Sequence, residues 1–354
     1  MMESVKIGFV GVGGMGQCAH LRNYAAIPGC EVVAIAEIRK DLGKKVAARY
    51  GVPNVYPDHA AMLAAEKLDG IVASQPYSRH GILLPDLYQA GVPVFTEKPL
   101  AGAIEVGERM LEALASSRAR HLVGYHKRSD PATMYARAEI DRLKKTGELG
   151  PMRYVRILMP AGDWIANGFA DLIPAQDAAP DLKWDAPPSD MGPETRRAYD
   201  SFVNYYIHQV NLMRHLLGER YTVSYADPAS VLLVVHSESG ITGTIEMSPY
   251  NTTVDWQEQA LIAFERGYIQ LDLPAPLASN RPGRVTVYRD PGNGATPEKV
   301  QPQLPWIHAM RQQAINFIAA IQGEPTPLCE AAEALEDLKI ARDYMAALRG
   351  DLSK

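Results

Sequence analysis

The first part of the chain, up to about Tyr125, alternates between short apolar runs and amphipathic segments, and this alternation limits the fold more than any other feature. The apolar runs are rich in β-branched residues, which favour strands, whereas the segments between them have helical spacing. The pattern indicates strands at residues 5–13, 30–38, 68–76, 93–100 and 120–126, and helices at 16–27, 40–51, 81–91 and 103–117. Strands separated by helices predict βαβ units and a parallel, doubly wound α/β sheet.

Beyond Asp130 the pattern changes to consecutive strands. A helix at 131–150 and a strand at 151–160 lead into an irregular stretch from Ala161 to about Arg197, of a length that is typically functional or mobile. After a helix at 201–218, the chain has strand-like segments at 221–227, 230–238, 241–249, 259–267, 267–273 and 284–290, and helices at 310–323 and 330–350. Strands without intervening helices predict a large, mostly antiparallel sheet in a second, α+β domain. We therefore expect domains at 1–125 and 126–354, with the last helix able to pack back on the first domain.

Three glycines follow the first strand with the spacing G-x-G-x-x-G: Gly11, Gly13 and Gly16. In a dinucleotide-binding turn the first permits the tight turn, the second lets the backbone approach a pyrophosphate, and the third lets helix and strand pack closely. Gly14 and Met15 complete the loop, and the helix that follows presents free N–H groups to phosphates. Plain strand–helix turns can carry the same pattern, so the glycines alone do not decide between the two.

Glu37 ends the second strand, where an acidic residue would bind the ribose hydroxyls of a dinucleotide. A carboxylate there repels a 2′-phosphate, which favours NAD over NADP. Arg39 and Lys40 weaken this preference, since either could contact a 2′-phosphate. The sequence thus predicts a site for NAD, with NADP as the less favoured cofactor.

The charge and cysteine content exclude several other classes of protein. With 36 Lys and Arg against 41 Asp and Glu, the net charge of -5 leaves no basic surplus for nucleic acid or an anionic membrane. No stretch approaches the roughly 20 apolar residues of a transmembrane helix, and the N-terminus lacks the pattern of a secretion signal. The three cysteines are scattered, which argues against a disulfide framework and a thiolate metal site. We expect a cytoplasmic protein without a metal.

Three further motifs accompany the glycine loop: SQPYSRHG after the third strand, FTEKPLA at the end of the next, and GYHKRSDP at the start of the second domain. Together they resemble the Gfo/Idh/MocA oxidoreductases, the group that includes glucose-fructose oxidoreductase and inositol dehydrogenase. The resemblance extends to TGELGPMRYVRI, IHQVNLMRHLLG and GEPTPLCEAAEALEDLKIA, and so covers nearly the whole chain. It implies a Rossmann domain, an α+β domain, and an oxidoreductase that uses NAD(P) on CH–OH groups.

The resemblance also implies roles at the carboxyl edge of the first sheet. The lysine of the family's E-K-P motif is Lys98, which would lie beside the nicotinamide and stabilise an alkoxide or help to transfer the hydroxyl proton. The Lys98–Pro99 bond is expected to be cis, and Glu97 would bind the cofactor ribose. The nicotinamide side would be lined by Ser74, Gln75, Pro76 and His80. His80 could instead cap or pack at the start of the next helix.

The family carries D-x-x-x-H on a helix of the second domain, and here Asn204 and His208 take these positions. Four residues apart, they would share one helical face. His208 is the candidate general acid/base, which takes the hydroxyl proton as the hydride leaves. Asn204 can orient a hydroxyl or the imidazole but cannot stabilise an imidazolium by charge. This departure leaves open a weaker base, a substrate that needs a hydrogen-bond donor, or an altered reaction.

Residues near the domain junction are expected to contact the substrate. The candidates are Tyr125, His126, Lys127, Trp164, Asn204 and His208. Trp164 could stack on a sugar face or form an oligomer contact, while Arg128 and Pro131 match the family's R-x-x-P element, which more often holds the domains together. The open face of the second sheet commonly packs against another subunit in this family, so a homodimer or homotetramer is expected.

The leading interpretation is an NAD-dependent dehydrogenase that moves a hydride between nicotinamide and a secondary alcohol of a sugar, cyclitol or glycoside. A second is redox-neutral glycoside cleavage, in which NAD is recycled through transient oxidation and elimination. A third, less favoured, is a non-catalytic dinucleotide-sensing regulator, against which the retained Lys98 and His208 argue. The substrate class comes from the resemblance, since nothing in the sequence names the sugar.

Overall fold

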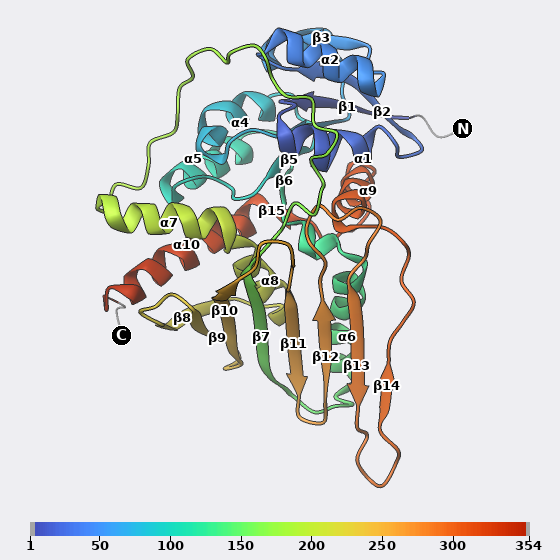
Figure 1. Ribbon diagram of the computed structural model, residues 1–354, viewed down its shortest axis with the longest axis vertical. Coiled ribbons are helices and arrows are strands. Elements are labelled where there is room, and N and C mark those ends of the chain that lie inside the picture. The colour runs from blue at the N-terminus through green and yellow to red at the C-terminus, as the bar shows by residue number, and fades with distance from the viewer. Residues whose placement is uncertain (1–3, 352–354) are drawn as a thin grey trace. The chain divides into compact units, whose positions relative to one another are not determined.

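The computed structural model describes residues 4–351 and divides the chain into two compact units. The first unit comprises the chain up to Tyr125 together with residues 167–196 and 313–338. The second comprises residues 126–166, 197–312 and the chain from Lys339 onward. Each unit holds its own sheet (Figure 1).

Among the described residues, the sheet of the first unit has seven strands in the order β15-β6-β5-β4-β1-β2-β3. They are β1 (Val5–Val10), β2 (Cys30–Ala36), β3 (Asn54–Tyr56), β4 (Gly70–Ala73), β5 (Val94–Glu97), β6 (His121–Gly124) and β15 (Cys329–Glu330). All neighbouring pairs are parallel except β15 with β6. The expected doubly wound sheet is confirmed, and the short strands β3 and β15 are additions that the periodicity did not indicate. Because the strand order reverses between β1 and β4, their carboxyl ends flank the point at which such sheets bind nucleotides.

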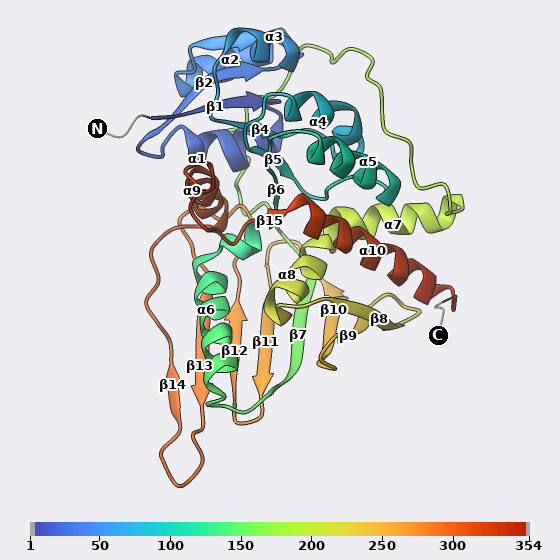
Figure 2. The ribbon, with the colours of Figure 1, turned by 180° about the vertical axis from the view of Figure 1, so that it is seen from behind.

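The helices of the first unit lie where the alternation predicts them, except for a short helix at His59–Ala65 that it did not indicate. They are η1 (Gly16–Leu21), α1 (Arg22–Tyr24), α2 (Lys40–Tyr50), α3 (His59–Ala65), η2 (Tyr77–Arg79), α4 (His80–Tyr88), α5 (Ile104–Ala115) and most of α9 (Ala309–Ile321). Helix α9 comes from late in the chain yet lies beside α1 (Figure 2). The ring of Phe317 lies 6.3 Å from that of Tyr24 and 5.5 Å from that of Phe95. The core of the first unit is therefore completed by residues about two hundred positions beyond its last parallel strand.

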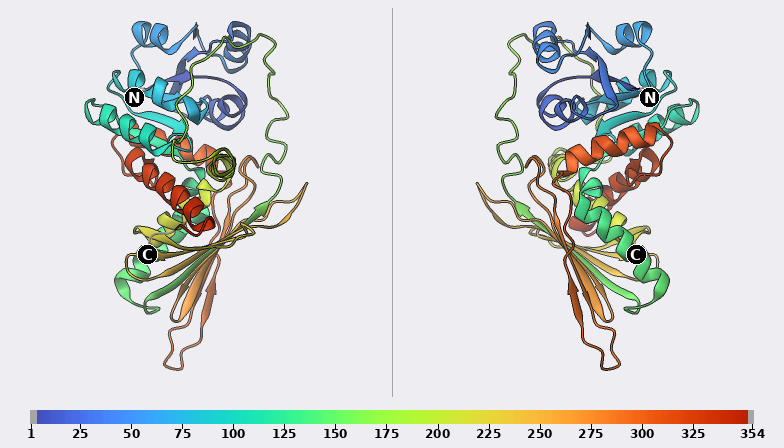
Figure 3. Two further views of the ribbon diagram at one scale, coloured as in Figure 1. Left: turned by 90° about the vertical axis from the view of Figure 1, so that its left-hand side faces the viewer. Right: turned by 90° about the vertical axis from the view of Figure 1, so that its right-hand side faces the viewer.

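The sheet of the second unit has eight strands in the described part of the chain, in the order β14-β13-β12-β11-β7-β10-β9-β8. They are β7 (Met152–Ala161), β8 (Tyr221–Ala226), β9 (Leu232–Ser237), β10 (Thr242–Asn251), β11 (Gln259–Phe264), β12 (Gly267–Asp272), β13 (Arg284–Arg289) and β14 (Glu298–Val300). Only β7 and β10 pair in parallel among these described strands. This confirms the mostly antiparallel sheet. Helices α6 and α8 pack on one side of it (Figure 3).

The helices assigned at least in part to the second unit differ from the prediction chiefly between residues 193 and 217. They are η3 (His126–Ser129), α6 (Pro131–Thr146), α7 (Pro193–Tyr205), α8 (Ile207–Leu217) and α10 (Ala331–Leu348). The single helix expected at 201–218 is two helices separated at Tyr206, and α7 begins within the stretch that was expected to be irregular up to Arg197. Pro193 suits a first helical position, and Tyr199, Phe202 and Val203 supply a buried apolar face at helical spacing.

Neither a membrane span nor a metal cluster is found among residues 4–351. No helix in this part of the chain has the length and apolarity needed to cross a membrane. Within the same residues, no three His, Cys, Asp or Glu side chains are grouped so that they could hold a metal ion.

Candidate active site

The glycine loop is shaped by close contact with the residues that follow β4. Gly11 has φ +88°, and a Cβ atom on it would lie 2.1 Å from Gln75 Nε2 and 2.7 Å from the carbonyl oxygen of Ser74. A Cβ atom on Gly16 would lie 2.6 Å from the carbonyl oxygen of Gly11. Both positions therefore require glycine. By contrast, no atom comes closer than 3.7 Å to the Cβ position of Gly13, and this open backbone fits the approach of a pyrophosphate.

The residues predicted to bind the dinucleotide are in contact with one another around this loop. Gly14 and Met15 form the first turn of the helix, and Gln17 N donates to Gly13 O at 2.9 Å. Gln75 Nε2 donates to Val10 O at 3.3 Å, which joins the end of β4 to the end of β1. Pro76 directly precedes η2. The structure thus brings the predicted residues 11–16 and 74–76 together at one edge of the sheet, although their contacts with a cofactor stay a prediction.

Glu37 follows β2 and is buried, and protein groups surround its carboxylate. Oε2 accepts hydrogen bonds from Val12 N at 2.9 Å and from Arg39 Nη2 at 3.2 Å. Oε1 accepts from the backbone N–H of Arg39 at 3.1 Å and from its Nε at 2.7 Å. A carboxylate has about four acceptor positions, and these four bonds occupy them. Glu37 therefore ties the glycine loop to the end of β2 and orients Arg39, while its predicted ribose contact stays a prediction.

The E-K-P motif begins at the end of β5, and its glutamate is held by a residue that the sequence did not single out. His20 Nε2 donates to Glu97 Oε1 at 2.5 Å, and Lys98 N donates to Glu97 Oε2 at 3.3 Å. Burial by itself raises the pKa of Glu97. The hydrogen bond and charge of His20, together with the charge of Lys98, lower the pKa by a larger amount, so the pKa of Glu97 lies below its ordinary value. Glu97 is therefore an oriented carboxylate next to Lys98, which is half-buried. The Lys98–Pro99 bond is cis, as expected.

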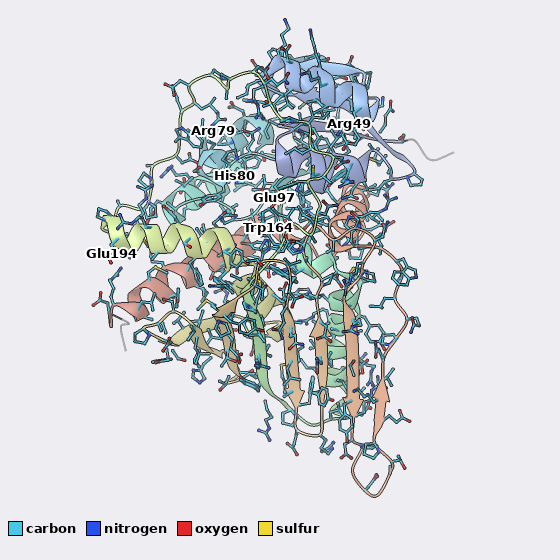
Figure 4. All side chains as sticks on the ribbon, viewed as in Figure 1. Arg49, Arg79, His80, Glu97, Trp164 and Glu194 are labelled. Carbon is cyan, nitrogen blue, oxygen red and sulfur yellow. The ribbon has the colours of Figure 1, made fainter. Side chains whose placement is uncertain are left out.

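His80 lies at the start of α4, one of the residues labelled with Glu97 in Figure 4. Its ring is fully buried, and Nδ1 donates to Leu100 O at 2.9 Å. Burial lowers the pKa of this imidazole below its ordinary value, so the ring is neutral at pH 7. The structure thus gives His80 the packing role considered as the alternative, and a contact with nicotinamide stays a prediction.

In the second unit, Asn204 and His208 lie on consecutive helices. Asn204 is exposed near the end of α7, whereas His208 is half-buried in the first turn of α8. The single helical face predicted for them is wrong, because the break at Tyr206 lies between them. His126 lies edge-on to His208, with ring centroids 4.6 Å apart. The structure therefore brings together His126 and His208, two of the predicted substrate residues.

The predicted junction element around Arg128 is bonded inside the second unit. Arg128 Nε donates to Asn211 Oδ1 at 2.6 Å, and both side chains are buried. Asp130 accepts from Ala132 N at 2.8 Å at the start of α6. Asp130 also accepts from Gly283 N at 3.0 Å, which ties this helix to the segment before β13.

A buried charged cluster is the feature of the second unit that sequence reasoning missed; it consists of Lys127, Gln209 and Glu258. Lys127 Nζ lies 2.5 Å from Glu258 Oε2, and Gln209 Nε2 donates to Glu258 Oε1 at 2.8 Å. The Lys127 ammonium also lies 5.6 Å from the centroid of the Trp256 ring. The adjoining cavity, of about 10 Å³, has room for about one water molecule. Lys127 thus serves a buried ion pair, and a substrate contact for it stays a prediction.

The two remaining predicted substrate residues lie in different units. Tyr125 is buried at the end of the first unit, and Trp164 is half-buried in the second. Near Trp164, a groove of about 630 Å³ is lined by residues that include Asp163, Trp256, Glu258 and Arg281. Its volume falls in the range of roughly 300–1,000 Å³ that is typical of small-molecule sites.

The part of the first unit that contains all its parallel strands matches a known protein family in sequence. Residues 5–125 fit the Gfo/Idh/MocA model, described as an oxidoreductase family with an NAD-binding Rossmann fold. Residues 5–125 thus have the sequence of the NAD-binding domain of the Gfo/Idh/MocA oxidoreductases. The enzyme therefore uses a nicotinamide cofactor, with NAD as the expected form.

Similar proteins extend the likeness beyond this unit. The scyllo-inositol 2-dehydrogenase (NAD(+)) of Bacillus subtilis strain 168 is 24% identical to this oxidoreductase over 263 residues, which are 70% of this chain and 68% of that protein. An inositol 2-dehydrogenase of Acidothermus cellulolyticus is 31% identical over 149 residues, only 42% of either protein. The solved structure of levoglucosan dehydrogenase, in complex with NADH and levoglucosan, has a TM-score of 0.71 at 18% identity and covers 99% of this chain and 98% of that chain. The fold is thus shared over the full length.

Proposed function

We propose that this oxidoreductase moves a hydride between NAD and a secondary alcohol of a cyclitol or sugar. The observation that carries the proposal is the position of Lys98, directly after β5. Since β1, β4 and β5 are neighbouring parallel strands, Lys98 lies at the same sheet edge as the glycine loop. The substrate class is supported by the similar inositol dehydrogenases and by the levoglucosan dehydrogenase of the same fold.

The side chains divide the reaction between them. The glycine loop would hold NAD, which would supply the hydride acceptor for the alcohol carbon. The ammonium of Lys98 would donate a hydrogen bond to the alcohol oxygen and stabilise the negative charge that develops there. His208 would accept the hydroxyl proton, with its ring positioned by His126. Asn204 would orient a hydroxyl without adding charge.

The test is turnover of NAD by the purified enzyme with a panel of cyclitols, sugars and glycosides. With an accepted substrate, we expect Lys98→Met to lower kcat by about 100-fold to 1,000-fold, the effect of removing one group that stabilises an oxyanion. NADH binding should persist, because the phosphate loop is unchanged. Lys67→Met, at an exposed lysine of the same unit, is the matched control and should retain full activity.

Three results would contradict the proposal. Absence of nicotinamide reduction across the panel would exclude an alcohol of these classes. Glycoside cleavage without net NADH would assign the redox-neutral reaction instead. Equal turnover by the Lys98→Met variant would remove Lys98 from the mechanism.

We further propose that the enzyme is a homodimer or homotetramer that uses the sheet face opposite α6 and α8. These helices pack on one side of the eight-stranded sheet. Light scattering of the purified enzyme measures the oligomeric state, and a monomer would contradict the proposal.

A further inference from the structure

Residues 167–185, here called the strap, belong to the first unit although the chain reaches them from β7 of the second. Figure 1 shows this yellow-green segment passing beside β1 and α2. Its partners in the first unit follow β1, β2 and β4, and so lie at the carboxyl edge of the parallel sheet. The strap therefore adds side chains to the edge at which the dinucleotide is expected.

Hydrogen bonds at both ends fix the course of the strap. Gln17 Oε1 accepts from Ile173 N at 3.1 Å, and Gln17 Nε2 donates to Ile173 O at 3.2 Å. Lys45 Nζ donates to Gln176 Oε1 at 2.8 Å. At the other end, Asp185 Oδ2 accepts from Gly81 N at 2.8 Å. The segment around Gln176 is thus held between the glycine-loop helix and α2.

In the strap, Asp177 has a carboxylate of which only one oxygen accepts a hydrogen bond from the described residues. Its Oδ2 accepts from Asp41 N in the first turn of α2, at 2.9 Å. Its Oδ1 is buried and has no hydrogen-bond partner among residues 4–351. A buried carboxylate oxygen is costly without a donor, so this atom is suited to receive one from a ligand.

The two carboxylates near the end of β2 therefore differ in what they can still bind. The four acceptor positions of Glu37 are occupied by Val12 and Arg39, whereas Oδ1 of Asp177 is available for a hydroxyl. Asp177 is bonded to the backbone of Asp41, two residues beyond Arg39. The hydrogen bond with Glu37 raises the pKa of Arg39, and the charge of Asp177 adds to this rise. Asp177 is thus near the segment that reads the adenosine ribose in this fold.

We infer that Asp177, rather than Glu37, accepts the hydroxyl of the adenosine ribose of NAD and rejects the 2′-phosphate of NADP. A phosphate at that position would bring about two negative charges against a partly buried carboxylate, where water screens repulsion weakly. The strap therefore determines cofactor choice from outside the parallel strands. The inference concerns the dinucleotide alone and does not depend on which alcohol is oxidised.

The experiment is titration of the full-length enzyme with NADH and with NADPH, followed by nicotinamide fluorescence in the absence of any alcohol. Loss of one hydrogen bond to a charged acceptor changes affinity by about tenfold. Asp177→Asn should therefore weaken NADH binding about tenfold and, by removing the repulsion, strengthen NADPH binding about tenfold. Asp177→Glu keeps the charge and should keep the preference for NADH.

Two further variants distinguish a role of Asp177 in choosing between NADH and NADPH from a change that affects the binding of both. Glu37→Gln should weaken NADH and NADPH binding by similar factors, because it loosens the glycine loop that both share. Asp171→Asn makes the same charge change elsewhere on the strap, where Asp171 pairs with Arg22 at 3.4 Å, and should leave the ratio of the two affinities unchanged.

The inference is overturned if Asp177→Asn, folded as judged by its thermal unfolding, leaves the ratio of affinities unchanged. It is also overturned if Glu37→Gln shifts the ratio and Asp177→Asn does not. If Asp177→Asn does not fold, Asp177→Ser takes its place. Because no alcohol is present, these results are independent of the proposed substrate class.

Discussion

The glycine loop of the first unit and the buried charged cluster of the second unit are built in opposite ways. The loop depends on backbone: Gly11 and Gly16 leave no room for a side chain next to Ser74, Gln75 and their own main chain. The cluster depends on side chains, since Lys127, Gln209 and Glu258 come from widely separated parts of the sequence. The comparison teaches that a backbone requirement leaves a local signature in the sequence, whereas a pairing of distant charges leaves none.

The largest effect should come from breaking the ion pair of the cluster. Lys127→Met leaves the buried Glu258 carboxylate without its counter-ion and should lower the free energy of unfolding by about 3–5 kcal/mol. Urea denaturation of the full chain measures this. The matched control is Glu265→Gln, which breaks the exposed pair between Arg153 and Glu265 and should cost at most about 1 kcal/mol. Similar costs for the two variants would show that burial does not distinguish these pairs.

The next largest loss of stability should come from the glycine loop. Comparing Gly11 with Gly29 separates the cost of a left-handed backbone from the cost of a steric overlap at the Cβ position. Gly11 and Gly29 both have positive φ, +88° and +76°, but a Cβ atom on Gly29 would meet nothing within 4 Å. Gly29→Ala should therefore lower the free energy of unfolding by about 1–2 kcal/mol, the cost of the left-handed backbone alone. Gly11→Ala should cost more, because its Cβ atom would overlap Gln75, and should also abolish NADH binding in fluorescence titration. Equal stability losses would contradict the contact argument.

The smallest effect concerns the pH dependence of stability near the cluster. Burial raises the pKa of Asp130 from 3.8 to about 6, although hydrogen bonds from Ala132 and Gly283 oppose the rise. Between these two values the unfolded chain has lost the proton that the folded chain retains, so the contribution of Asp130 to stability falls as pH rises. Above about 6 that contribution is constant.

Asp130→Asn removes this titration while keeping a side chain that can cap α6. The free energy of unfolding of the variant, relative to the natural chain, should therefore increase from pH 3.8 to about 6 and then level off. Urea denaturation of both proteins across this range provides the measurement. A difference that stays constant with pH would show that the folded carboxyl titrates normally.

Prediction from sequence succeeded where a structural feature depends only on residues within one short segment. The spacing of Gly11, Gly13 and Gly16 is a property of one short segment, and the cis peptide before Pro99 was implied by the family resemblance of the E-K-P motif; the structure contains both. Helix α7 was partly missed because the stretch before it is rich in Asp, Pro and Gly, although Tyr199, Phe202 and Val203 already had helical spacing. His20 could not be found, because its role depends on Glu97, which ends β5 and is far from His20 along the chain.

The sequence by itself determined the doubly wound sheet, the mostly antiparallel second sheet and the nicotinamide family, since periodicity and short motifs encode backbone geometry directly. Only the tertiary structure decided which carboxylates meet which donors. Glu37 proved to be fully engaged by Val12 and Arg39, and Asp177 was brought to the same edge by a strap from far along the chain. Hydrogen bonds and charges act over a few ångströms in space, and separation along the sequence does not reveal which side chains come that close.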